Sequence, residues 1–160
     1  MGHVDIIMAR FAYSIQGLDP DKTVKASIRE ADISFKHTRE IAINIKGMLL
    51  ERAKLYLEEV IAMKRSVPFK RYNKKIGHRS DLKGWDTGRY PVKAAGEILT
   101  CLESLEKNAS NLGLEVDRLV LIHAAAQRGR KIKRIFPRAF GSSSPKVNTL
   151  THLELVAEEI

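Results

Sequence analysis

The residues best suited to binding chemistry lie in one run, residues 127–146, which is rich in cations and contains no acid. Two segments that alternate like strands, 119–126 and 147–157, flank this run. Each buried unpaired cation would cost on the order of several kcal/mol, so the run cannot pack into a core. We therefore predict a long hairpin whose far end meets a polyanion, with RNA as the first candidate. The cations are Arg128, Arg130, Lys131, Lys133, Arg134, Arg138 and Lys146.

Apolar residues are interleaved with these cations, and they weigh against the alternative of a disordered basic loop that binds anions loosely. Ile132, Ile135, Phe136, Pro137 and Phe140 all lie in the run, whereas disordered basic segments usually lack such residues. Arginine forks match phosphate oxygens, so the cations are suited to an RNA backbone. We expect Phe136 and Phe140 to stack on bases or to wedge between RNA helices.

A second basic segment, residues 69–90, combines three glycines with one large anchor, Trp85, and is predicted to be an irregular loop. Two roles remain open for Trp85: it folds onto the domain, or it stacks on a base. Outside the run 127–146, the candidate RNA-binding residues are Lys36, Arg39, Lys70, Arg71, Lys74, Lys75, Arg79, Trp85 and Arg89.

The charge of the chain is concentrated rather than spread. The formal net charge is +9 and the isoelectric point is about 9.8. Residues 64–93 carry +8 and residues 127–146 carry +7, so the rest of the chain sums to −6. This balance points to a polyanionic partner. An acidic membrane surface is the weaker choice, because no cationic amphipathic helix accompanies the basic segments.

Catalytic and metal-binding constellations are not evident. Cys101 is the only cysteine, which excludes an intrachain disulfide and a cysteine-based zinc site. No histidine has a second ligand at metal spacing, and His123 and His152 are expected to face each other across the hairpin as a packing pair. No nucleophile lies beside a base, so we expect neither an enzyme, nor a cofactor, nor a small-molecule substrate.

The length of 160 residues suits a single domain, with residues 1–22 as an N-terminal arm. Residues 1–7 are too short and polar for a signal peptide, and Met8 is an alternative start. Alternation over residues 24–33 changes parity, which predicts a strand with a bulge at Arg29-Glu30. No apolar run is long enough to span a bilayer.

Three helices are expected between the first strand and the hairpin. The first begins after Ser34 as N-cap and ends near Gly47, and the second covers about residues 49–63 and is ended by Pro68. The third starts with Pro91 in its first turn and ends at Gly113. The predicted fold class is therefore α+β: a three-stranded antiparallel sheet with three helices and one long protruding β-hairpin. The apolar stripe of the third helix comprises Ala94, Ile98, Leu102, Leu105, Ala109 and Leu112.

These residues resemble the family of large-subunit ribosomal protein twenty-two. The hairpin signature is present as Lys133, the turn Arg138-Ala139-Phe140-Gly141-Ser142, and the return strand His152-Leu153-Glu154-Leu155. Ile33-Ser34 followed by Arg39 resembles the start of the family's first helix, although Phe35 stands where bacterial members often have proline. The segment Trp85–Pro91 is similar to the archaeal and eukaryotic branch of the family.

The resemblance implies a structural constituent of the cytoplasmic large ribosomal subunit. It implies partners in large-subunit rRNA, neighbouring ribosomal proteins and the nascent peptide in the exit tunnel. The alternative is a free-standing RNA- or DNA-binding module that uses a basic hairpin. The resemblance places a tunnel-lining tip at Arg138, Ala139, Phe140, Gly141, Ser142 and Ser143.

Overall fold

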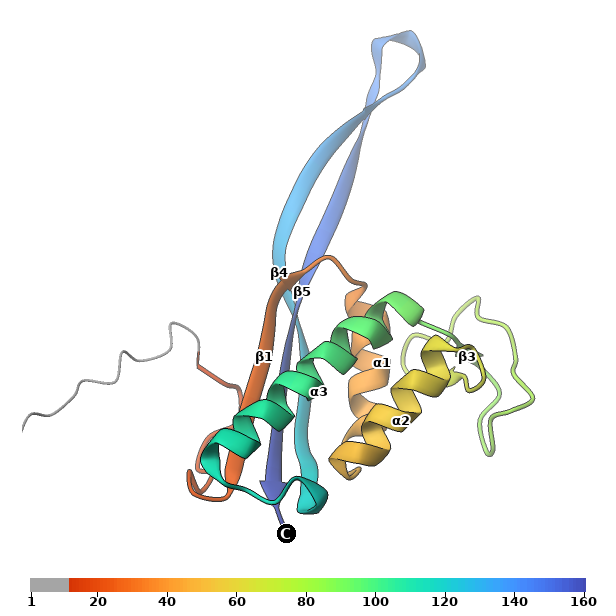
Figure 1. The fold of residues 1–160 in the computed structure, drawn as a ribbon. Helices are drawn as coiled ribbons and strands as arrows, with labels where there is room; N and C mark the ends of the chain where they lie inside the picture. Colours follow the sequence, from red (N-terminus) through yellow and green to blue (C-terminus); the bar gives the residue numbers. More distant parts are fainter. Residues whose placement is uncertain (1–11) are drawn as a thin grey trace, which may run out of the picture.

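The computed structural model describes residues 12–160 and confirms the predicted α+β fold. A three-stranded sheet carries three helices, and one two-stranded arm projects far beyond this body (Figure 1). The proposed extension at residues 1–7 and the start of the arm lie outside the described residues. In chain order the elements are β1 (Thr23–Ala31), α1 (Phe35–Ile45), α2 (Leu50–Ile61), β2 (Val67–Pro68), β3 (Gly88–Arg89), α3 (Val92–Leu112), η1 (Val116–Arg118), β4 (Leu119–Pro137), η2 (Ala139–Gly141) and β5 (Ser143–Glu159).

The main sheet has the order β1-β5-β4, and all of its neighbouring strands are antiparallel. Buried and exposed side chains alternate from Val24 to Ser27 of β1, whereas the central strand β5 is buried on both faces from Leu153 to Ala157. The inward side chains of the sheet pack against apolar stripes of the helices. Fully buried examples are Leu57 of α2, Ile98 and Leu102 of α3, Leu121 of β4 and Leu155 of β5. This core holds the base of the hairpin in place.

The hairpin extends the ladder of β4 and β5 far past the core. Pairing continues to Pro137 and Ser143, so residues 127–146 are a paired hairpin rather than a disordered loop. The tip closes through Phe140, at φ 57°, and Gly141, at φ 68°. The Arg138 N–H donates to the carbonyl of Ser142 at 2.9 Å across this turn.

Two irregularities meet where the hairpin leaves the body. The predicted bulge of β1 is confirmed, since the register shifts between Ile28 and Ala31. A second shift in β4 lies between Arg128 and Lys131. His152 lies beside both: its Nδ1 accepts the N–H of Glu30 at 3.0 Å, and a Cβ on Gly129 would lie 2.9 Å from its ring. Glycine at 129 therefore leaves room for the imidazole.

Some local predictions were wrong. His123 does not face His152; it pairs with Val156, whereas His152 pairs with Gln127, because the register separates the two imidazoles by four positions along the ladder. Helix α2 ends at Ile61, well before Pro68, which instead lies in β2. Leu112 is 61% exposed, so the buried stripe of α3 ends at Ala109.

The end of the N-terminal arm is fastened to the sheet by a buried acid. The carboxylate of Glu154 accepts the backbone N–H of Ser14 at 3.0 Å and its hydroxyl at 2.8 Å. Arg29 donates to the same carboxylate at 3.3 Å. Burial alone would raise the pKa of Glu154, but the bonds from Ser14 and the nearby Arg29 and His123 outweigh it, so the pKa is lowered. The ionised acid thus stabilises the docked arm.

This arrangement predicts a pH-dependent contribution to folding. Because the pKa of Glu154 is lower in the folded chain, its stabilisation is present above the ordinary value of 4.5 and is lost as the pH falls through the folded pKa. Substituting Ser14→Ala should lower the free energy of unfolding at pH 7 by about 1 kcal/mol. Urea titrations of both chains should show this difference shrinking as the pH falls below 4.5 and through the lowered pKa of Glu154. A difference that stays constant from pH 7 to pH 3 would contradict the assignment.

Candidate nucleic-acid interface

The two basic segments predicted from the sequence form two separate projections from one body (Figure 1). The hairpin extends from β4 and β5, and the loop between β2 and β3 lies beyond the C-terminal end of α2. Within residues 12–160 no helix is both long and apolar enough to cross a membrane, and no His, Cys, Asp and Glu side chains cluster as a metal site.

The hairpin keeps all seven of its predicted cations exposed to solvent. In the part of the chain that the structure describes, no ion pair neutralises any of them. Two guanidinium groups lie on aromatic rings instead: Arg128 is 5.0 Å from the Phe35 centroid, and Arg138 is 5.5 Å from that of Phe136. Stacking in this way orients the planar forks while both guanidinium groups remain exposed to solvent, where phosphate oxygens can reach them.

The tip presents the most exposed aromatic residue among those described. Phe140 has no cover from the rest of the chain, and Phe136 is 52% exposed. The Ser142 hydroxyl donates to the carbonyl of Ala139 at 2.7 Å, and Nε of Arg138 donates to Ser144 Oγ at 3.3 Å. All predicted tip residues, from Arg138 to Ser143, are therefore brought together at one exposed turn.

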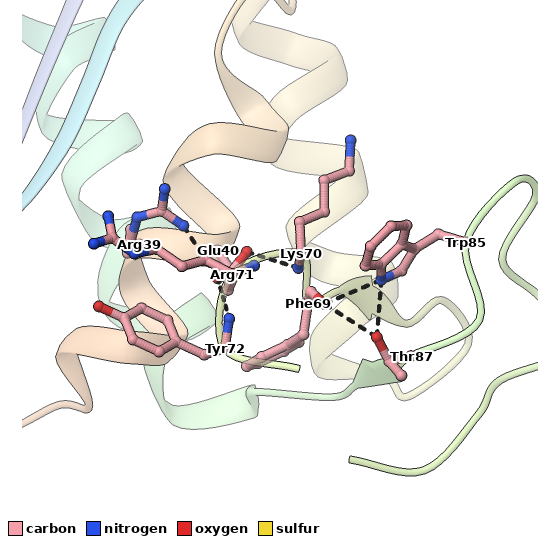
Figure 2. A network of polar contacts seen from close by, with 8 residues as sticks. All are labelled: Arg39, Glu40, Phe69, Lys70, Arg71, Tyr72, Trp85 and Thr87. Atoms are coloured by element: carbon pink, nitrogen blue, oxygen red, sulfur yellow. Dashed lines mark hydrogen bonds and ion pairs between the residues drawn. The ribbon is translucent and has the colours of Figure 1, made fainter. Parts of the chain in front are cut away.

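The insertion loop has more order than the sequence suggested. Val67 and Pro68 pair with Arg89 and Gly88, which closes residues 69–87 at their base. The indole N–H of Trp85 donates to the carbonyl of Phe69 at 3.0 Å and to Thr87 Oγ1 at 2.8 Å (Figure 2). Of the two roles considered for Trp85, the structure favours folding onto the domain.

A buried carboxylate, which sequence reasoning missed, fixes the start of this loop. Glu40 of α1 is 2% exposed and accepts three successive backbone N–H groups (Figure 2). Its Oε2 accepts that of Lys70 at 3.1 Å, and its Oε1 accepts those of Arg71 and Tyr72 at 3.2 Å each. Consecutive N–H groups of this kind form an anion-binding concavity. Here the protein's own acid fills it, and the side chains of Lys70 and Arg71 remain exposed to solvent.

The same network includes Arg39, which the sequence predicted to be an RNA-binding residue. Arg39 donates to Glu40 Oε1 at 3.2 Å, and its guanidinium lies 5.8 Å from the centroid of Tyr72. Its charge is thus largely satisfied inside the protein, and an RNA contact by Arg39 stays a prediction. Lys36, 5.5 Å from the same ring, is exposed and has no ion pair within residues 12–160.

The remaining cations of the loop are exposed, and two of them also contact other groups of the protein. Arg79 lies 4.9 Å from the centroid of Tyr90, and Arg89 Nη2 donates to the carbonyl of Lys75 at 3.4 Å. Burial, with Arg89 and Lys36 close by, lowers the pKa of His37, which keeps that imidazole neutral beside them. The other exposed cations of the loop are Lys70, Arg71, Lys74, Lys75 and Lys83.

We predict that Glu40→Gln loosens the loop specifically. One amide oxygen cannot hold three N–H groups and Arg39, so the free energy of unfolding should fall by about 2 kcal/mol or more. Exchange of the amide protons of residues 70–72 should accelerate. The matched control is Glu103→Gln, an exposed acid in the middle of α3, which should leave both quantities unchanged. Equal behaviour of the two variants would show that the Glu40 network does not order the loop.

Comparisons with known proteins agree with this geometry. The family model described as "Ribosomal protein L22p/L17e" matches residues 26–158. The chain is 51% identical over 152 residues to "Large ribosomal subunit protein uL22" of Cenarchaeum symbiosum, covering 95% of this chain and 99% of that protein. It is 52% identical over 147 residues to the protein of the same name in Methanosphaera stadtmanae, covering 92% and 96%. It is 50% identical over 151 residues to that of Archaeoglobus fulgidus, covering 94% and 97%. The chain therefore belongs to the ribosomal protein L22p/L17e family.

Proposed function

We propose that this chain is a structural constituent of the cytoplasmic large ribosomal subunit, where it binds and organises rRNA. The observation that carries the proposal is the hairpin: seven exposed cations, without ion pairs inside the described chain, on an arm that no part of the body covers. Such a surface is stable only in contact with water or with anions, and folded RNA supplies closely spaced phosphates. The archaeal relatives carry the name of a large-subunit protein, which supports the same assignment.

The finer part of the proposal concerns the tip. Residues 138–143 line the exit tunnel, and the nascent peptide and neighbouring ribosomal proteins are further partners. The exposed turn with Phe140 supports this role, because a narrow two-stranded arm can pass between RNA helices where a globular domain cannot. We propose that the protein acts through architecture and assembly rather than catalysis.

Sedimentation tests the assignment to the ribosome. Cell lysate is run through sucrose gradients at moderate and at high salt, and the fractions are probed for this chain. It should migrate with the large subunit and remain there at high salt, because many phosphate contacts act together. A chain that stays at the top of the gradient, or that modest salt removes, would point to a free-standing module acting on another nucleic acid.

A second prediction concerns the two tip aromatics. If Phe136 and Phe140 stack on or between bases, Phe136→Ala/Phe140→Ala should weaken the order of the tip within assembled subunits. Base stacking contributes roughly 1–3 kcal/mol per aromatic ring, so hydrogen exchange at residues 136–144 should accelerate at least about fivefold.

The matched control is Leu55→Ala, an exposed apolar residue of α2 that lies far from the hairpin. If the hydrogen-exchange rates at the tip are the same in the double variant and in this control, the stacking role is refuted. If both variants are still incorporated into large subunits, the ribosomal assignment remains intact.

A further inference from the structure

A cleft at the base of the hairpin brings together cations from three segments that are distant in the sequence. We call it the root cleft and define it by Asp32, Ser34, Lys36, Lys93, Arg128 and Lys131, which are among its lining residues. Lys36 comes from the first turn of α1, Lys93 from the first turn of α3, and the other two cations from β4. The fold therefore assembles a basic site that no single run of the sequence displays.

The charges of the root cleft are almost all of one sign. Asp32 is the only acid among its lining residues, and its carboxylate is already engaged. It accepts Asn148 Nδ2 at 2.7 Å and Lys93 Nζ at 3.4 Å. Lys36, Arg128 and Lys131 are exposed and have no ion pair within residues 12–160. Three cations thus remain available to an anionic ligand.

Phe35, an aromatic lining residue of the cleft, orients the Arg128 guanidinium. The guanidinium of Arg128 lies 5.0 Å from the centroid of Phe35, and Phe35 in turn meets Tyr72 edge to face at 6.4 Å. Helices α1 and α3 both begin at this cleft, and no side chain caps either of them. These helix ends add a favourable field for anions, although the three cations carry the inference.

A second cleft continues from the first. Its lining includes Lys36 and His37, which it shares with the root cleft, and also Arg71, Lys74 and Arg89 of the insertion loop. The hairpin and the loop lie apart in the ribbon of Figure 1. The two clefts nevertheless join them in one basic path, because both clefts include Lys36 and His37 at the start of α1. Glu40 holds residues 70–72 beside this path.

We propose that the root cleft seats a sugar–phosphate strand of rRNA that runs from the hairpin across α1 to the insertion loop. A linear polyanion fits this surface better than a compact anion, because the cations follow a path rather than surround a point. The inference rests on the proposed function, since it names where the same RNA partner lies on the chain. Lys93 and Asn148 become members of the site as the groups that hold Asp32 away from the phosphates.

Tethered cleavage locates the strand directly. Cys101 is buried, and burial raises the pKa of its thiol to about 12, so an introduced exposed cysteine can be labelled selectively. Ser34→Cys, at the exposed rim of the cleft, would carry an iron chelate that generates hydroxyl radicals. The control is Ser110→Cys, at the far end of α3. The probe is a transcript of the large-subunit rRNA from the same source, bound to the full-length chain.

Strong backbone cleavage from residue 34, together with weak cleavage from residue 110, is the expected result. Equal or absent cleavage from residue 34, with the labelled chain shown to be bound, would overturn the root cleft while leaving the proposed function intact. Failure of the unsubstituted chain to bind the transcript at all would count against both.

A matched charge experiment gives an independent readout. The variant Lys36→Ala/Arg128→Ala/Lys131→Ala removes the free cations of the cleft. The control, Lys22→Ala/Arg52→Ala/Lys107→Ala, removes three exposed cations elsewhere. The first should reduce the slope of log K against log salt concentration by about 2 to 3, since each phosphate contact contributes roughly 0.7 to 0.9. Unchanged slopes for both variants, with circular dichroism showing intact folding, would refute the site.

Discussion

The dominant physical constraint on this chain is the free energy of removing unpaired cations from water. The run of residues 127–146, at the far ends of β4 and β5 and in the turn that joins them, carries seven cations without a single acid, and no arrangement of the fold could bury them. The body solves this by ending its core near Leu121 and Leu153 and letting the same two strands continue outward as a ladder. Backbone pairing keeps the arm extended, while the charges stay at its surface for an external polyanion.

Two buried acids fasten the insertion loop and the N-terminal arm to that body. Glu40 gathers three backbone N–H groups of the insertion loop, and Glu154 fastens the arm at Ser14 to the sheet. Each of these acids forms an ion pair with an arginine, but each also accepts hydrogen bonds from the backbone. Each satisfies backbone donors that would otherwise be unpaired, which is why their loss is expected to loosen a segment rather than to change net charge only.

Patterns with a short period were enough to predict much of the fold. Alternation identified β1 with its bulge and the two hairpin strands, and the stripe of Ile98, Leu102 and Leu105 identified α3. The cations of the candidate interface could be predicted, because charged residues can be read directly from a sequence. Contacts that depend on register or on distant backbone could not: the offset of His123 from His152 and the backbone N–H groups that donate to Glu40 follow from tertiary structure alone. The root cleft could not be predicted for the same reason, since Asp32 and Asn148, which meet in it, are 116 residues apart in the sequence.

The most direct test of the account is a three-dimensional reconstruction of the large ribosomal subunit that contains this chain. The account predicts that the cationic groups of the hairpin lie within hydrogen-bonding distance of rRNA phosphates, with residues 138–143 in the wall of the exit tunnel. A hairpin that extends into solvent, with its arginines and lysines facing no phosphate, would contradict it.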